Sequence, residues 1–94
     1  MPTWLIIAEE TVTENGAATY RQVTVLRPVS GNKSREEALV DLYRAARGYV
    51  PDSLRSTIRV TGRDGDGSFW VLPKNGKGKT RASCNIRLIE QIRP

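Results

Sequence analysis

The stretch from Lys74 to Arg81 has the residue types that bind phosphate. It reads Lys-Asn-Gly-Lys-Gly-Lys-Thr-Arg, with four cations and two glycines in eight residues. Repeated glycine excludes a helix interior and predicts a loop between two ordered segments. Cations on such a loop create a positive field that attracts phosphate or an acidic partner. Lys74, Lys77, Lys79 and Arg81 are therefore candidate phosphate contacts.

The segment Gly78-Lys79-Thr80 matches the end of a Walker A loop, Gly-x-x-x-x-Gly-Lys-Ser/Thr. The full motif requires glycine where this chain has Pro73, and it requires a helix afterwards. Residues 81–88 instead alternate between polar and apolar, as a strand does. The pattern favours a glycine-rich tip with solvated lysines over a nucleotide-binding loop.

The segment Asp64-Gly-Asp-Gly67 resembles the middle of a calcium-binding EF-hand loop. Aligned on Gly67, the first ligand position falls on Gly62 and the bidentate glutamate position falls on Pro73, so two charged ligands are missing. The sequence therefore predicts a turn between two strands here, and no metal site.

The chain has no histidine, which excludes Ser-His and Cys-His nucleophile pairs and imidazole metal ligands. Cys84 lies on the apolar side of its expected strand, which indicates a core residue. Glu9 and Glu10 are neighbours on a strand and point to opposite faces. Because no catalytic constellation emerges, we expect a protein that is not an enzyme and has no cofactor.

A platform for nucleic acid is the more specific interpretation. Trp70 and Arg59 are expected on one face of two neighbouring strands near the basic loop, and Arg87 joins them if the last strand pairs alongside. Stacking rings and nearby cations hold single-stranded nucleic acid in this way. A lone tryptophan that serves only packing is the alternative.

The charge distribution agrees with an anion-binding C-terminal half. The net charge is +5, and the sequence pI is about 9.9. Residues 1–31 contribute −1 and residues 32–55 contribute +1, whereas residues 56–94 carry eight cations against three acids and contribute +5. A basic domain is an electrostatic footprint of nucleic acid or another polyanion, although a solvated surface is the ordinary reading of such an excess.

The elements that must position these residues begin with a hairpin over residues 3–27. Asn15-Gly16 is a strong hairpin signal because both positions tolerate a positive φ. With a two-residue turn there, the residue numbers of cross-strand partners add up to 31, which pairs Glu10 with Arg21. This register gathers apolar residues on one face: Trp4, Ile6, Ala8, Val23 and Val25.

Ser34-Arg-Glu-Glu37 is a capping box and predicts a helix over residues 35–48, with Leu39, Leu42, Tyr43 and Ala46 on its buried face. Three strands are expected within residues 55–92: one over 55–62 with Ile58 and Val60 inward, one over 68–73, and one with Ala82, Cys84, Ile86 and Leu88 inward. The period-two alternation ends at Ile89, so the sequence does not decide whether residues 89–94 form a strand, a helix or an irregular segment.

The order ββαβββ indicates a single α+β domain over residues 1–94, with one helix packed on one face of an antiparallel sheet. Apolar residues are also expected on the other face: Leu5, Ile7, Tyr20, Leu26, Trp70 and Leu72. Either the sheet curls over a second core, or that face meets a partner such as a second copy of the chain, or these residues are merely scattered.

The opening Met-Pro-Thr-Trp-Leu-Ile-Ile-Ala-Glu-Glu-Thr-Val-Thr-Glu-Asn-Gly resembles short uncharacterised proteins of GC-rich actinobacteria, as do the helix from Ala38 to Tyr49 and the later Asp-Gly strand pair. The resemblance implies a bacterial cytoplasmic protein and carries no activity or site residue. A lone cysteine also favours a reducing cytoplasm, and the apolar run from Trp4 to Ala8 is too short to span a bilayer. We therefore expect a cytoplasmic module that binds nucleic acid or another polyanion, or alternatively one that binds a protein partner or itself.

Overall fold

The structure is a computed structural model that describes residues 3–74 and 80–93. Two long strands, β1 (Thr3–Glu14) and β2 (Ala17–Val29), precede the helix α1 (Arg35–Gly48) and a 3-10 turn η1 (Asp52–Leu54). Three further strands follow: β3 (Arg59–Arg63), β4 (Phe69–Pro73) and β5 (Thr80–Gln91). The order ββαβββ is therefore confirmed.

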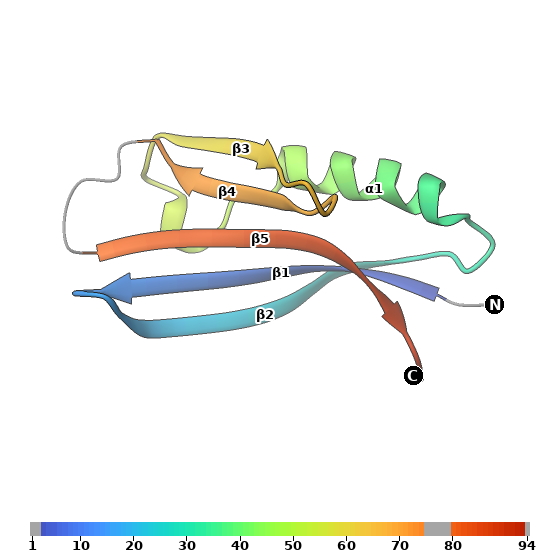
Figure 1. Ribbon diagram of the computed structural model, residues 1–94, viewed down its shortest axis with the longest axis horizontal. Helices are drawn as coiled ribbons and strands as arrows, with labels where there is room; N and C mark the ends of the chain where they lie inside the picture. Colours follow the sequence, from blue (N-terminus) through green and yellow to red (C-terminus); the bar gives the residue numbers. More distant parts are fainter. Residues whose placement is uncertain (1–2, 75–79, 94) are drawn as a thin grey trace.

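All five strands form one antiparallel sheet in the order β2-β1-β5-β4-β3, and α1 lies behind it (Figure 1). β5 returns from the far end of the chain to pair with β1, and this long-range pairing makes β5 a central strand. The α+β class and the helix on one face agree with the prediction from sequence.

The hairpin turns at Asn15 and Gly16, whose φ angles are 54° and 83°. Two positive φ angles are typical of a type I′ turn, which matches the twist of the flanking strands. The predicted register holds only beside the turn, where Glu14 pairs with Ala17 and Thr13 with Ala18.

Beyond that point the predicted hairpin register is wrong. Register shifts between Val12 and Thr13 and between Ile6 and Ile7 move the partners by one residue each. Glu10 therefore pairs with Gln22 rather than with Arg21. Such bulges leave one residue of a strand unpaired and turn the following side chains to the other face.

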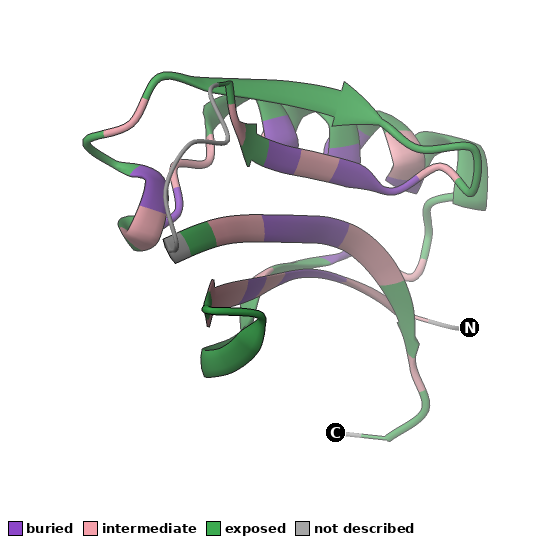
Figure 2. Ribbon diagram, turned by 60° about the vertical axis from the view of Figure 1, so that its left-hand side comes forward, coloured by how far each residue is buried: buried purple, intermediate pink, exposed green. Residues whose placement is uncertain are grey.

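The core lies between α1 and the sheet, as the buried ribbon segments in Figure 2 show. The helix is held at its start by the predicted capping box, in which the Glu37 amide donates to Ser34 Oγ and the Ser34 amide donates to Glu37 Oε1. The core residues come from every element except β3: Ile6, Ala8, Val29, Ala38, Leu42, Ala46, Leu54, Phe69, Val71, Cys84 and Ile86.

The third strand begins later than predicted, because residues 55–58 form a turn after η1 and β3 starts only at Arg59. Ile58 is 70% exposed and Val60 is 45% exposed, so the expectation that both point inward is wrong. β5 in contrast continues through Ile89 to Gln91, which resolves most of the C-terminal region left open above.

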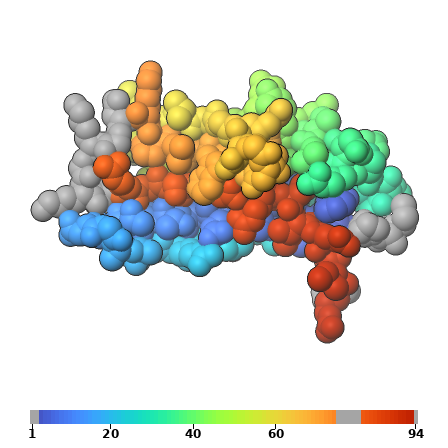
Figure 3. All heavy atoms as spheres, in the orientation of Figure 1, coloured from blue at the N-terminus to red at the C-terminus, as the bar shows by residue number. Residues whose placement is uncertain are grey.

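The other face of the sheet carries no helix, and we call it the open face. Regular pairing of β1 with β5 places Ile7 opposite Arg87 and Glu9 opposite Asn85 on this side. Atoms of the strands lie at the front of the view in Figure 3, while α1 emerges only at the upper right margin. Among the described helices, none is long and apolar enough to cross a membrane.

Candidate nucleic-acid interface

Trp70 occupies the middle of the open face on β4. It pairs with Asn85 of β5 and with Gly62 of β3, so its ring has no side chain across from it on β3. Its indole Nε1 donates to Asp64 Oδ2 at 2.9 Å, which orients the half-buried ring. The predicted separation of Trp70 and Leu72 from the buried Phe69 and Val71 is confirmed.

Arg87 reaches the same face, as the sequence predicted. Its Nη1 donates to Asn85 Oδ1 at 2.9 Å and to Glu9 Oε1 at 3.0 Å. Arg21 of β2 donates to the other carboxylate oxygen of Glu9 at 2.6 Å. The hydrogen bond from Arg87, with a further one from Arg21, holds the pKa of the Glu9 carboxyl below its usual range.

Arg59 is not part of this face, and the expectation that it shares a side with Trp70 is wrong. It pairs with Pro73, one residue out of phase with Trp70 and Leu72. Its guanidinium turns to the helix side, where Nη1 donates to the carbonyls of Thr57 and Leu54 at 3.4 and 3.5 Å. The alternation along β3 decides this placement.

The start of β3, the end of β4 and the start of β5 lie at the same end of the sheet, on the left in Figure 1. The amide of Lys74 donates to the Ile58 carbonyl at 2.8 Å, which places Lys74 beside Arg59. Arg81 lines one hollow together with Leu72 and Pro73. We call Arg59, Lys74 and Arg81 the basic end; Lys77 and Lys79 lie outside the described residues.

These three cations make no ion pair within the described part of the chain. Acids pair instead with cations elsewhere: Glu9 with Arg21 and Arg87, Asp41 with Arg27 and Lys33, and Asp52 with Arg55. Glu14 lies opposite Thr80 in the ladder, yet no ion pair joins it to Arg81 among the described residues. The positive charge of the basic end is therefore not neutralised locally.

The candidate interface for a partner changes in composition. Tyr20 pairs with Val12, and Leu26 packs against the core cluster, so both lie on the helix side and not on the open face. Leu5 is half-buried, and Ile7 is only 4% exposed. The shift in register instead brings Val23 and Val25 to the open face, where their side chains are 52% and 55% exposed. Three more exposed apolar residues lie on this face: Ile89 on β5, Val60 on β3 and Leu72 on β4.

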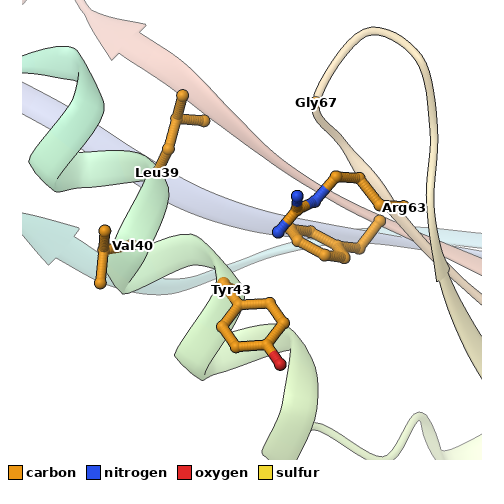
Figure 4. A pocket seen from close by; sticks show the side chains of 6 residues that line it. Leu39, Val40, Tyr43, Arg63 and Gly67 are labelled. Atoms are coloured by element: carbon orange, nitrogen blue, oxygen red, sulfur yellow. The ribbon is translucent and has the colours of Figure 1, made fainter.

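A second group of cations and aromatic rings lies on the helix side, between α1 and β3 (Figure 4). The guanidinium carbon of Arg63 is 5.2 Å from the ring centroid of Phe69 and 5.7 Å from that of Tyr43. Arg47 lies 5.5 Å from the Tyr43 centroid. Sequence reasoning missed this group: the four-residue spacing of Tyr43 and Arg47 was visible, but which strand faces them was not.

The other chemical candidates are used structurally. Asp66 Oδ1 accepts from the amide and the hydroxyl of Ser68, and these bonds hold the pKa of its carboxyl low. Asp64 Oδ1 accepts from the Gly65 amide, so the Asp-Gly segment is a turn held by its own carboxylates. No group of three acidic or cysteine side chains in the described regions is arranged to hold a metal ion. A strand follows the Lys-Thr segment, unlike in a Walker A loop.

Cys84 lies in the core, as predicted. Burial raises the pKa of its thiol to about 11, so the thiolate nucleophile is scarce at neutral pH.

No protein-family model, curated protein or solved structure matches this chain. Its function must therefore follow from its own residues, and the resemblance to actinobacterial proteins stays a prediction.

Proposed function

We propose that this chain is a non-catalytic binding module that holds single-stranded nucleic acid. The observation that carries the proposal is the basic end, where Arg59, Lys74 and Arg81 carry charge that no described carboxylate neutralises. Phosphates would contact this end and the neighbouring loop, and the strand would continue over Trp70 and Arg87 on the open face. The half-buried Trp70 ring has no side chain across from it on β3, which leaves room for a stacked base, and the cations would follow the backbone.

A cytoplasmic location goes with this proposal, because nucleic acid is available there and a single buried thiol needs no oxidising compartment. Catalysis is not part of it, since the chain has no histidine and Cys84 is held protonated.

The test is a fluorescence-anisotropy titration of a labelled oligouridine at several salt concentrations, with a duplex and heparin in parallel. Arg81→Gln should lower the magnitude of the salt slope by about 0.7, the value for one phosphate contact on a single strand. Arg44→Gln, at an exposed position of α1, removes the same charge from the helix side and serves as the matched control. Absence of oligouridine binding even at low salt would refute the proposal. If the two variants had the same dependence of affinity on salt, the basic end would not contact phosphate.

A homodimer through the open face is a second candidate. The observation that favours it is the exposure of Val23 and Val25, at 52% and 55%, on a face without a helix. Antiparallel sheets commonly leave one face in water, but that face is then usually polar. Val25→Glu should shift a dimer to monomer in sedimentation equilibrium, whereas Val40→Glu on the exposed side of α1 should not. A wild-type chain that sediments as a monomer at all concentrations would rule out the dimer.

A further inference from the structure

β3 is an edge strand with one unpaired side. The sheet order places it outermost, next to β4, and all five of its residues are exposed. Within residues 3–74 and 80–93, no strand pairs with its other side. An exposed edge presents N–H and C=O groups on which another extended chain can pair.

The hydrogen bonds of the β3–β4 pair tell which backbone groups point outward. The Lys74 amide donates to the Ile58 carbonyl, and the Asp64 amide donates to the Ser68 carbonyl, each at 2.8 Å. Because hydrogen-bonded pairs recur at every second residue of an antiparallel ladder, Val60 and Gly62 also direct their groups toward β4. Arg59, Thr61 and Arg63 therefore direct their N–H and C=O groups to the free edge.

The same three residues have their side chains on the helix side, beside two hollows. One hollow, of about 350 Å³, is lined by Leu39, Val40, Tyr43 and Phe69 along with Arg63 and Gly67 (Figure 4). The adjoining hollow, of about 230 Å³, is lined in part by Tyr43, Arg47, Thr61 and Arg63. A residue that pairs with Thr61 would point its side chain to this side of the sheet.

The charge beside the hollows has one sign. Arg47 and Arg63 stack near the Tyr43 ring, and neither makes an ion pair with a described carboxylate. A guanidinium that lies over a ring still presents its N–H groups to a carboxylate. The edge thus offers backbone pairing, an apolar hollow and two available cations together.

We propose that β3 binds an extended acidic peptide segment as a sixth strand of the sheet. Its backbone would pair with Thr61 and Arg63, an apolar side chain would enter the hollow beside Leu39 and Phe69, and its carboxylates would meet Arg47 and Arg63. Peptide recognition by strand addition obtains affinity from the backbone and specificity from such side-chain sites.

Two other occupants match the edge less well. A second copy of β3, paired antiparallel about Thr61, would set Arg59 against Arg63 with no carboxylate on either strand, and like charges opposite one another are unfavourable. Nucleic acid can meet the arginines but has no ladder of amide groups for the outward N–H and C=O groups of β3.

The experiment uses the whole chain and a fluorescent peptide of alternating glutamate and valine, as long as β3. Thr61→Pro deletes an outward N–H while leaving the bonds to β4, because proline is tolerated at such edge positions. Thr61→Val keeps the N–H and is the matched control. We expect Thr61→Pro to weaken peptide binding roughly tenfold, since it loses one backbone bond and places a ring at the edge, and Thr61→Val to leave it unchanged.

Arg63→Glu provides a test that does not depend on proline. We expect it to lose the glutamate peptide and to gain affinity for the corresponding lysine–valine peptide, with an unchanged circular dichroism spectrum. Failure of the wild-type chain to bind the glutamate peptide would overturn the proposal, and the arginines of β3 would then only protect the edge from aggregation. Equal affinity of the two Thr61 variants for the glutamate peptide would also overturn the proposal. So would either of two results that assign the edge to another occupant: oligouridine that displaces the peptide and binds more weakly to Thr61→Pro, or a dimer of the wild-type chain that Thr61→Pro dissociates.

Discussion

The Glu9 carboxylate sets how much positive charge the open face presents to a ligand. It accepts from Arg21 at 2.6 Å and from Arg87 at 3.0 Å, and its own side chain is 18% exposed. Glu9→Gln keeps an acceptor oxygen but removes the negative charge, so both guanidiniums become available to phosphate. If single-stranded nucleic acid crosses this face, the substitution should strengthen binding.

The size of the effect follows from the number of cations released. Each phosphate contact contributes about 0.7 to the magnitude of the salt slope on a single strand, so two freed arginines add up to about 1.4. Between about 50 mM and about 200 mM salt, a slope change of that size alters the affinity ratio roughly sevenfold. The cost in stability should be no more than about 1 to 2 kcal/mol, because Arg21 is 67% exposed and such pairs contribute roughly 0.2–1 kcal/mol each.

The assay is the anisotropy titration with oligouridine over that salt range, together with urea unfolding of each variant. Glu36→Gln in the first turn of α1 makes the same change in net charge on the other side of the sheet and is the matched control. Equal slopes for the two variants would show that only net charge matters. Weaker binding by a folded Glu9→Gln variant would refute the reasoning.

Three further outcomes concern the scaffold. Leu42→Ala, at a side chain only 1% exposed between α1 and the sheet, should lower the free energy of unfolding by about 2–5 kcal/mol in urea titrations, and a loss below 1 kcal/mol would contradict the packing described. Ser34→Ala should cost about 1 kcal/mol because the Glu37 amide loses its acceptor, whereas Ser34→Thr should retain most of the stability. The pKa of the Asp41 carboxyl is held low chiefly by the hydrogen bond from Lys33, so its contribution is present above the ordinary aspartate pKa and is lost as the pH falls below about 4. Asp41→Asn should flatten that acid limb, and an unchanged pH dependence of unfolding would count against it.

Local signals in the sequence predicted the elements well. Asn15-Gly16 specified the hairpin turn and Ser34-Arg-Glu-Glu37 specified the helix start, because each signal acts through backbone groups a few residues away. The alternation from Ala82 to Leu88 likewise predicted which side of the last strand is buried, and Cys84 and Ile86 are fully buried there.

The candidate site was predicted only in part. Trp70 and Arg87 share the open face as expected, but Arg59 does not, because the phase of β3 was set by taking Ile58 and Val60 as inward residues. Val60 in fact pairs with Leu72 on the open face, which turns Arg59 to the helix side. The link from Glu9 to Arg87 was missed because it depends on β5 lying beside β1, and no local pattern encodes that neighbour. The link from Glu9 to Arg21 was missed because the register shift beyond Thr13 places Arg21 opposite Thr11 and on the side of Glu9.

The sequence by itself determined the charge surplus after residue 55, the absence of histidine chemistry and the type of each main element. Those properties depend on composition and on backbone preferences over short spans. The tertiary structure decided which cations remain unpaired and which strand forms the free edge. It also decided that Val23 and Val25 face outward, since the register shift between Val12 and Thr13 moved them away from the core. These outcomes depend on how distant strands pack, and one shift of register reverses the face of every side chain that follows.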